Sequence, residues 1–480
     1  MSILTNKRVW SDYQKSVFED ISRGTGHTAV IAVAGSGKTS VIIEGFKYIP
    51  KKMRTLMISF NKSNAEDLKN KAPSYVECLT LHSLGFRAIK NAFGKAVKLN
   101  PDKTLNIITE LFEAKGFKKQ QKNGFDTIFS LVRTTSLCKS YLQDIPSKID
   151  ELMDSFDVDC GLLDREDFIK TICQTLRKCK EIKDFIDFDD MIYFPASFGL
   201  ALGKWDYVFC DEVQDFSLAQ VNMILSACRI DGRIMAVGDI NQAIYSFRGA
   251  DSESITNLIK RLDAKQLPLS ITYRCPKSVV KLAQEFVPHL EASPTAKEGL
   301  VKEIPEKTFL DLVRPGDCVL SRINAPLIYY CMRLLRNKIP ANIQGKDIGA
   351  NLAWMIKKSE KKTVVDFLRW LDDWKAMECA RLKAKNRDPI LILDKAECLE
   401  GLCEGCKSTS EVLANIKELF TDNDEANVVI CSSIHKFKGQ ERNRVFLLAW
   451  TLRKNMNQEE NNICYVAYTR AKEELYLVKK

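Results

Sequence analysis

Short apolar runs alternate with amphipathic segments along the first 90 residues of the chain. The run HTAVIAVAG at residues 27–35 is typical of a buried strand, and TSVIIEGFKYI at residues 39–49 is typical of a helix. This alternation indicates a parallel sheet whose strands are joined by crossover helices. The same rhythm returns in three later stretches, at residues 205–274, 316–337 and 427–478.

Two long segments interrupt this rhythm with helical patterns. The first covers residues 91–184 and the second runs from about residue 350 to residue 426. In the second segment, five apolar residues recur at a spacing that places them on one helix face, and we expect this stripe to be core. The stripe consists of Val364, Phe367, Leu368, Leu371 and Trp374. We therefore predict an α/β protein with two parallel-sheet domains, each interrupted by a helical insertion.

The composition is that of an ordinary globular protein. Of 480 residues, 45% are hydrophobic and 28% are charged, which excludes a disordered or fibrous chain. No apolar run reaches the roughly 18 residues of a membrane span, and the first residues do not resemble a signal peptide. We expect a soluble, non-secreted protein of the cytoplasm, a nucleoid or a viral replication site. The net charge of +10 has the sign expected for a phosphate-bearing partner, but it does not separate nucleic acid binding from solubility.

The segment AVAGSGKT at residues 32–39 has the pattern of a phosphate-binding loop between a strand and a helix. Gly35 and Gly37 allow backbone N–H groups to surround phosphate oxygens, and Lys38 can reach the β and γ phosphates. The hydroxyl of Thr39 can bind Mg²⁺. The leading glycine of the usual pattern is Ala32 here.

Two adjacent acids follow the apolar run YVFC at residues 207–210. Asp211 would lie at the carboxyl end of a buried strand, where it could bind Mg²⁺ together with Thr39, and Glu212 could activate the attacking water. An acidic helix cap is the alternative explanation. The phosphate-binding loop upstream favours the catalytic interpretation.

The segments DEVQDFSLAQ and AVGDINQAIYSFRGA, at residues 211–220 and 236–250, resemble superfamily 1 helicases of the UvrD/Rep type. The F-box DNA helicase branch of this family is more similar to the segments FNKSNAEDL and VECLTLHSLGF. The resemblance implies two RecA-like cores of the P-loop NTPase class. It assigns the first core to residues 1–90 and 185–274 with a helical insertion at 91–184, and the second core to residues 275–350 and 426–480 with a short helical insertion at 351–425.

The resemblance also implies an ATP and Mg²⁺ site. Gln14 would read the adenine edge, Tyr273 would stack on the adenine, and Glu441 would hold the ribose hydroxyls. Loop residues would surround the phosphates: Ala34, Gly35, Ser36, Gly37, Lys38, Thr39 and Ser40.

Four further residues match family positions near the γ-phosphate. Arg274 and Arg470 would stabilise charge that develops on the γ-phosphate during transfer. Gln214 and Gln242 would sense whether that phosphate is present. The expected catalytic residues are Lys38, Glu212, Gln242, Arg274 and Arg470.

The family binds a single strand by stacking and backbone contacts. The matching positions here are Phe60, Thr80, His82, Tyr245, Phe247, Arg248, Ser433 and His435. Phe247 stands where the family usually has tryptophan, which keeps an aromatic face but reduces its area.

The function implied by the resemblance is ATP-dependent translocation on single-stranded DNA with 3′–5′ helicase activity, in replication, recombination or repair. The expected substrates are single strands and tailed or forked duplexes, bound by a monomer. A motor that strips a recombinase or other replication protein from DNA with little unwinding is an alternative, because the second insertion is short. An RNA helicase is another, since stacking and backbone contacts do not exclude ribose hydroxyls.

Sixteen cysteines are scattered through apolar runs, which favours reduced core residues. Cys398, Cys403 and Cys406 lie close together, with Cys379 as a fourth candidate ligand for zinc or an iron–sulfur cluster. Only one CxxC pair occurs, and the segment also has a helical pattern. We therefore expect a structural role for this cluster.

Overall fold

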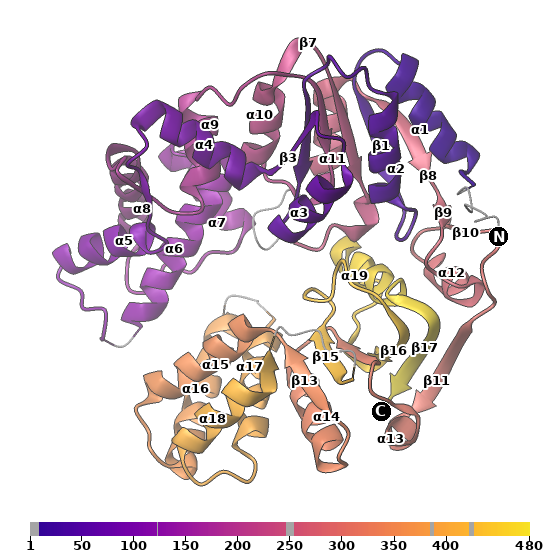
Figure 1. The fold of residues 1–480 in the computed structure, drawn as a ribbon. Helices are drawn as coiled ribbons and strands as arrows, with labels where there is room; N and C mark the ends of the chain where they lie inside the picture. Colours follow the sequence, from indigo (N-terminus) through magenta and orange to yellow (C-terminus); the bar gives the residue numbers. More distant parts are fainter. Residues whose placement is uncertain (1–8, 122, 246–253, 385–387, 422–426) are drawn as a thin grey trace. The chain divides into compact units, whose positions relative to one another are not determined.

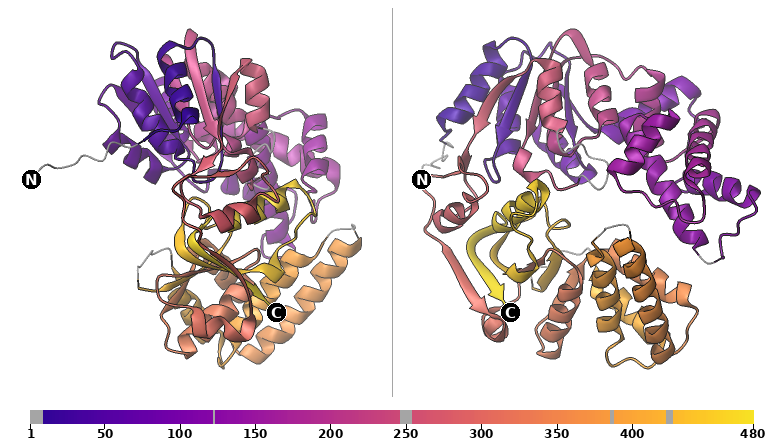
Figure 2. Two further views of the ribbon diagram at one scale, coloured as in Figure 1. Left: turned by 90° about the vertical axis from the view of Figure 1, so that its right-hand side faces the viewer. Right: turned by 180° about the vertical axis from the view of Figure 1, so that it is seen from behind.

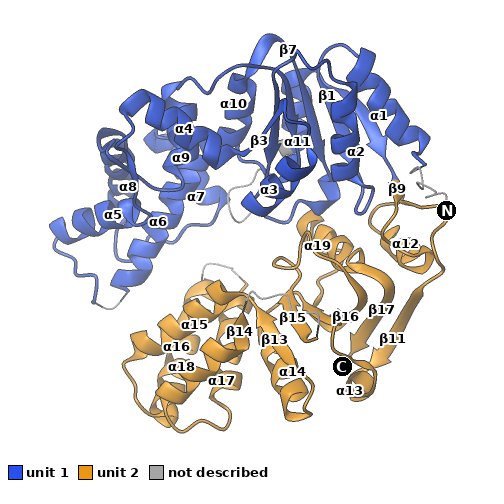
Figure 3. Cartoon of the chain, viewed as in Figure 1, with its two compact units in different colours: residues 1–270 blue, residues 271–480 orange. Residues whose placement is uncertain are grey.

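The computed structural model describes residues 9–121, 123–245, 254–384, 388–421 and 427–480 (Figure 1). The chain forms two compact units, residues 1–270 and residues 271–480 (Figure 3). Each unit contains one large parallel sheet with flanking helices. The predicted fold class, two RecA-like α/β domains, is confirmed.

Unit 1 is built on a six-stranded sheet with the order β3-β2-β6-β7-β1-β8, in which all strand pairs are parallel. Its strands are β1 (Thr28–Ala32), β2 (Thr55–Ser59), β3 (Val76–Thr80), β6 (Trp205–Cys210), β7 (Cys228–Gly238) and β8 (Lys265–Leu269). The helices around it are α1 (Asp12–Arg23), α2 (Lys38–Gly45), α3 (Lys62–Lys71), α4 (Leu81–Phe93), α10 (Leu218–Ala227) and α11 (Ser254–Leu262), and Figure 2 shows them on both faces of the sheet.

The strands β1, β2 and β6 are buried on both faces of the sheet, which explains why they are mostly apolar. Successive residues of β6 point to opposite faces: Tyr207 and Phe209 pack into one core cluster, and Val208 and Cys210 into the other. The first cluster also contains Val17 of α1 and residues of α2.

The helical part of unit 1 has a hydrophobic core of its own. Its helices are α5 (Lys103–Ala114), α6 (Gly124–Tyr141), α7 (Pro146–Ser155), α8 (Arg165–Glu181) and α9 (Asp190–Phe198), with the short strands β4 (Lys98–Leu99) and β5 (Phe185–Ile186). Ile108, Leu131, Phe168 and Phe194 are among the fully buried residues of this core.

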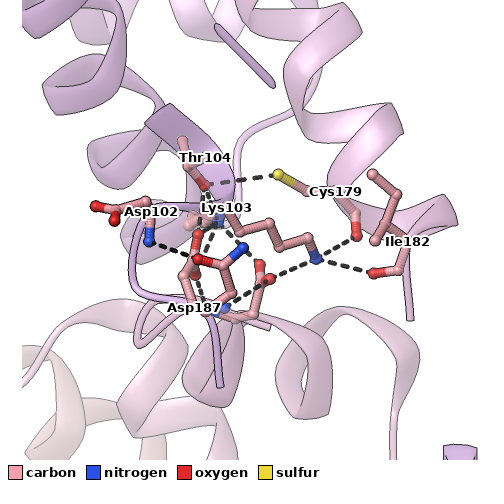
Figure 4. Close-up of polar contacts among 9 residues, drawn as sticks. Asp102, Lys103, Thr104, Cys179, Ile182 and Asp187 are labelled. Atoms are coloured by element: carbon pink, nitrogen blue, oxygen red, sulfur yellow. Dashed lines mark hydrogen bonds and ion pairs between the residues drawn. The ribbon is translucent and has the colours of Figure 1, made fainter. Parts of the chain in front are cut away.

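A polar cluster lies inside this helical part (Figure 4). The ammonium of Lys103 donates to Asp190 at 2.7 Å and to the carbonyls of Cys179 and Ile182, both at 2.9 Å. The ammonium of Lys139 lies 2.8 Å from Asp190 and 3.0 Å from Asp187. We call Lys103, Lys139, Asp187 and Asp190 the buried ion cluster.

Unit 2 is built on a seven-stranded parallel sheet with the order β11-β17-β16-β12-β15-β13-β14. Its strands are β11 (Leu300–Pro305), β12 (Cys318–Ser321), β13 (Ala341–Gln344), β14 (Phe420–Thr421), β15 (Val429–Ser433), β16 (Arg442–Leu448) and β17 (Ala471–Lys479). A separate pair is formed by β9 (Ile271–Thr272) and β10 (Glu291–Ala292). The helices are α12 (Lys277–Ala283), α13 (Phe309–Leu312), α14 (Ala325–Arg336), α15 (Lys346–Ser359), α16 (Val364–Ala384), α17 (Ile390–Cys403), α18 (Thr409–Leu419) and α19 (Gln458–Tyr468).

The helices α15–α18 share one hydrophobic core with the sheet of unit 2. This cluster joins Ile343 of β13 and Phe446 of β16 to Leu352, Phe367 and Leu399 of the helices. The apolar stripe predicted at residues 364–374 packs into this core, as expected. Among the described helices, none is long and apolar enough to cross a membrane.

Candidate nucleotide and nucleic-acid sites

The phosphate-binding loop connects β1 to α2. Gly35 and Gly37 have φ values of 72° and 80°, a left-handed conformation that glycine adopts without strain. Gly37 is the N-cap of α2 and makes no side-chain capping bond. The first N–H groups of α2 and the positive end of its dipole are therefore suited to an anion.

Acids from two strand ends face Lys38. In the sheet order, β7 lies between β6 and β1, so the carboxyl ends of β6 and β7 lie on one side of the loop that follows β1. The ammonium of Lys38 lies 3.1 Å from Glu212, which follows β6. Asp211, also after β6, and Asp239, after β7, are almost fully buried.

The charges in this group shift its pKa values. Burial lowers the pKa of Lys38, but the charges of Glu212, Asp211 and Asp239 outweigh burial, so that the pKa is raised. Burial, followed by repulsion from Glu212, raises the pKa of Asp211 to about 7. Burial also raises the pKa of Asp239. Three carboxyl groups thus surround a single ammonium.

This excess of carboxyl groups over ammonium groups fits a divalent cation. Carboxylate and hydroxyl oxygens are ligands that Mg²⁺ prefers, and a cation would favour the ionised form of Asp211. Thr39 lies in the first turn of α2 with its side chain exposed. Asp211 and Thr39 are the residues that would hold the ion.

A chain of hydrogen bonds links the acids to two glutamines. The amide of Gln214 donates to Glu212 at 2.5 Å, and its oxygen accepts the N–H of Asp239 at 3.0 Å. The amide of Gln242 donates to Asp239 at 2.7 Å. Gly238 leaves room for this arrangement, because a Cβ would lie 2.6 Å from the Gln214 oxygen and would displace the amide.

Asp239 is absent from the residues predicted for the site, although it connects Gln214 to Gln242. Its position directly after an apolar strand and three residues before Gln242 is the same sequence signal that identified Asp211. The signal was available in the segment VGDINQ.

The backbone of Glu212 has a φ of 56°, which is unusual for a residue with a side chain. This conformation starts the turn from β6 into the segment Val213–Asp215. The side chain of Glu212 is 25% exposed, whereas Asp211 beside it is 4% exposed. The strained backbone therefore carries the carboxylate that a ligand can reach.

Gln14 of α1 lies beside the phosphate-binding loop. Its amide donates to the carbonyl of Ser36 at 3.2 Å, and its oxygen accepts the N–H of Ser11 in a capping box at the start of α1. Ala34 and Ser36 are buried in the loop, and Ser40 is half-buried in α2. The capping box at the start of α1 thus holds the Gln14 side chain beside the phosphate-binding loop.

In unit 2, the predicted nucleotide residues gather near the amino ends of β16 and β17. Arg274 donates to the Glu441 carboxylate at 2.5 Å and to the Thr469 carbonyl at 3.4 Å. Burial raises the pKa of Glu441, but the charge of Arg274 outweighs it and the pKa is lowered. Arg470 is 1% exposed, and Tyr273, next to Arg274, is 41% exposed.

Hydrogen bonds within unit 2 hold the guanidinium of Arg470. It donates to the carbonyls of Val466 at 2.8 Å and Gln440 at 3.2 Å, and to the hydroxyl of Thr469 at 3.0 Å. These contacts fix the start of β17 against the segment that carries Glu441.

Three predicted nucleic-acid residues of unit 1 line one cavity of about 170 Å³. Phe60, His82 and Tyr245 come from the ends of different elements. Its other walls are formed by Lys139, Ser140, Asp189, Ile192, Asp215, Ser217 and Gln220. Burial lowers the pKa of His82, with Asp189 opposing, so the ring is neutral near pH 7.

The remaining predicted nucleic-acid residues have other positions. Thr80 caps α4 and accepts the N–H of Ser83 at 3.2 Å. Ser433 is buried at the carboxyl end of β15, and His435 follows it half-buried. Phe247 and Arg248 lie outside the described residues.

All sixteen cysteines are free thiols. Cys398 and Cys403 are buried on α17, and Cys406 donates to the Leu402 carbonyl. Within the described residues, no group of three or more His, Cys, Asp or Glu side chains is placed to hold a metal ion.

Residues 13–263 match the family model described as the UvrD/REP helicase N-terminal domain. The chain belongs to the UvrD/REP helicase family. Residues 428–478 match the UvrD-like helicase C-terminal domain, which confirms the resemblance found in the motifs.

Several curated proteins of the UvrD/REP family are similar to this chain. F-box DNA helicase protein 1 of Schizosaccharomyces pombe is 26% identical, over 93% of this chain and 55% of the relative. ATP-dependent DNA helicase Rep of Buchnera aphidicola is 26% identical, over 57% of this chain and 43% of the relative. ATP-dependent DNA helicase PcrA of Bacillus subtilis is 23% identical, over 56% of this chain and 38% of the relative. The chain spans about half or less of the length of these relatives.

Proposed function

We propose that this protein is an ATP-driven motor that moves along single-stranded DNA and unwinds duplex with 3′–5′ polarity. The observation that carries the proposal is the group around Lys38, in which three acids surround one ammonium at the end of a phosphate-binding loop. The UvrD/REP family membership and the names of the relatives support the same activity.

In the proposed mechanism, the phosphates lie on the loop N–H groups and Lys38. Mg²⁺, held by Thr39 and Asp211, would neutralise charge on the phosphate oxygens. Glu212 would orient the attacking water and accept its proton, which its partial exposure permits. Arg274 and Arg470 would stabilise the charge on the γ-phosphate, with Gln14, Tyr273 and Glu441 holding adenosine.

The hydrogen-bond chain offers a route from the phosphate to the single strand. Gln214 is bonded to Glu212 and to Asp239, which in turn binds Gln242. Tyr245 follows Gln242 by three residues and lines the cavity with Phe60 and His82. Loss of the γ-phosphate would rearrange these bonds and thereby change the grip on a base at the cavity.

Nucleotide turnover with and without single strands tests the proposal. We expect ATP hydrolysis to rise steeply with single-stranded DNA, and duplexes with a 3′ tail to be unwound in preference to those with a 5′ tail. Turnover that is unaffected by any single strand would reject the motor. Stimulation by single-stranded RNA alone would instead favour the RNA helicase alternative.

Phe60 tests the nucleic-acid assignment. Phe60→Ala removes an aromatic face that is 39% exposed at the cavity, and we expect the concentration of single-stranded DNA for half-maximal turnover to rise about tenfold. Phe129→Ala is the matched control, because this ring is 70% exposed on α6 and lies outside the cavity. Equal effects of the two substitutions would contradict the assignment.

A second candidate function is displacement of proteins from DNA with little unwinding. It is favoured by the helices α15–α18, which pack into the sheet's own core and form no separately packed domain. Strong unwinding of a forked duplex without any partner protein would exclude this function, whereas removal of a bound recombinase without unwinding would support it.

A further inference from the structure

The cavity of about 170 Å³ in unit 1 contains a charged group that stacking on a single strand does not use. Beside the aromatic residues Phe60 and Tyr245, it is lined by Asp189, the residue before α9. Asp189 is half-buried, and neither of its carboxylate oxygens is fully buried. A base that stacks in this cavity would therefore meet an acid as well as two rings.

The fold makes little use of the Asp189 carboxylate. Asp189 is the N-cap of α9 but forms no side-chain capping bond, whereas Asp164 at the same position of α8 accepts the N–H of Asp167 at 2.7 Å. Within the described part of the chain, no residue forms an ion pair with Asp189, because Lys139 binds the carboxylates of the buried ion cluster instead. The acceptor capacity of this carboxylate remains available to a ligand.

The surroundings of Asp189 leave its ionised form short of donors. Burial raises the pKa of this carboxyl group, the charge of Lys139 opposes the rise, and the charge of Asp187 adds to it. The hydroxyl of Ser136 favours the ionised form, but a carboxylate has about four acceptor sites. N–H groups of a ligand would stabilise the ionised carboxylate, whereas a ligand oxygen would be repelled by it.

The charges of the cavity favour a base over the phosphate backbone. Asp215 lines the cavity together with Asp189, so a phosphate would meet two acids. Lys139 is also in the wall, but its side chain is 1% exposed and its ammonium is held in the buried ion cluster. The rings of Phe60 and Tyr245 provide faces on which a base can stack. The edge of that base would then face Asp189, and contacts to base edges distinguish one base from another.

We propose that Asp189 makes this cavity prefer bases that carry an exocyclic amino group, such as cytosine and adenine, over thymine. The inference rests on the proposed function, because it requires a single strand at the cavity. The amino group of cytosine or adenine would donate to Asp189. His82, which also lines the cavity and is near enough to feel the charge of Asp189, could donate to the ring nitrogen beside that amino group.

Thymine fits this pair of side chains less well. Its single ring N–H lies between two carbonyl oxygens, so a carboxylate that accepts this N–H is repelled by an oxygen on either side. The rings of Phe60 and Tyr245 do not correct the difference, because stacking is available to every base. The preference would therefore come from Asp189 and would be superimposed on binding that is otherwise independent of sequence.

The test compares two fluorescently labelled single strands of equal length, one of thymidine and one of 5-methyldeoxycytidine. The two bases share their shape and their methyl group and differ at the exocyclic amine and the adjacent ring nitrogen. Fluorescence anisotropy with the whole chain, without nucleotide, gives the two dissociation constants. We expect the 5-methyldeoxycytidine strand to bind about fivefold more tightly, the lower end of the discrimination that a good base contact provides. Equal affinities, or tighter binding of thymidine, would overturn the proposal.

Asp189→Asn separates recognition from a structural role. The amide keeps the shape of the carboxylate but both donates and accepts, so the ratio of the two dissociation constants should fall to about one, chiefly through tighter binding of thymidine. Asp184→Asn is the matched control, because Asp184 is exposed in the same helical part and lies outside the cavity. Equal weakening of both strands by Asp189→Asn, with the ratio unchanged, would show a structural role and overturn the proposal.

A failure of this inference can be told apart from a failure of the proposed function. Phe60→Ala should weaken both strands alike, because its ring stacks on either base. If the unchanged protein binds both strands equally and both stimulate ATP turnover, the base preference alone is rejected. If it binds neither strand, the motor is rejected and the base preference with it.

Discussion

Unit 1 holds two groups in which lysines meet carboxylates, and they differ in exposure and in balance. In the buried ion cluster, the lysine and aspartate side chains are at most 7% exposed, and the charge of neighbouring Asp189 also acts on Lys139. At the phosphate-binding loop, Lys38 is 12% and Glu212 25% exposed, and one ammonium faces three acids. The ion pairs of the first group are enclosed by the fold, whereas the second group is more exposed and has three acids around one ammonium, which a bound cation would compensate.

A structural ion network and a reactive one respond differently when a charged residue is substituted. Removing one partner from a fully buried pair leaves an uncompensated charge and destabilises the fold. An unbalanced group at a strand end, with strain at Glu212, is suited to ligand chemistry. We therefore expect substitutions in the first group to change stability and those in the second to change turnover.

The largest effect is expected from Lys38→Ala. Loss of its ammonium removes charge stabilisation at the phosphates, so ATP turnover stimulated by single strands should fall about a thousandfold or more. A malachite-green phosphate assay measures this, with urea unfolding as the control for folding. Turnover near that of the unchanged protein would remove Lys38 from the site.

Lys103→Met is expected to act on stability. It removes an ammonium that binds Asp190 and two carbonyls inside the helical part, so the free energy of unfolding should fall by about 3 kcal/mol. Urea unfolding followed by circular dichroism measures the loss. Lys98→Met, on an exposed and short strand nearby, is the matched control and should change little.

The buried ion cluster should also make the protein sensitive to acid. Burial raises the pKa of Asp187, but the charge of Lys139 and the hydroxyl of Thr104 outweigh burial, so the pKa is lowered. The resulting stability is present above the ordinary aspartate pKa of about 3.9 and is lost as the pH falls through the lowered value. Asp187→Asn should flatten this acid dependence in urea unfolding between about pH 5 and pH 2. Parallel curves for the two proteins would count against Asp187 as its source.

The smallest effect concerns the backbone at Glu212. Glu212→Gly and Glu212→Ala both remove the carboxylate, but only glycine accepts a φ of 56° without strain. We expect the glycine variant to be more stable than the alanine variant by about 1 kcal/mol in urea unfolding, and both to lose turnover. Equal stability would show that the conformation stores no strain.

The sequence was sufficient to predict the fold class, because apolar strands and amphipathic helices alternate in both units. It also predicted one site for Lys38, Asp211 and Glu212, and the structure brings these residues together because their positions depend on local motifs and strand ends. The residues that connect them were harder to find. Asp239 reaches the group only because β7 lies between β6 and β1 in the sheet, and strand order is not readable from periodicity.

The cavities were not predictable for a related reason. Phe60, His82 and Tyr245 converge with Lys139 and Asp189 through the packing of α6 and α9, which no single segment encodes. A cavity of unit 2 likewise joins helix α17 to Trp450 and Lys480, which follow the ends of β16 and β17. Such sites require long-range contacts, whereas the phosphate-binding loop is complete within eight residues.

The two helical parts also differ in how they could be exchanged during evolution. Most core residues of the helical part of unit 1 pack against one another, and Ile192 and Ala196 of α9 join the core of the sheet, so a homologous insertion of different length would have to reproduce only these contacts of α9 with the sheet core. The helices α15–α18 of unit 2 are continuous with the core beneath β13 and β16, so any replacement must reproduce those contacts. Variation in length among relatives should therefore be tolerated more readily in the first unit than in the second.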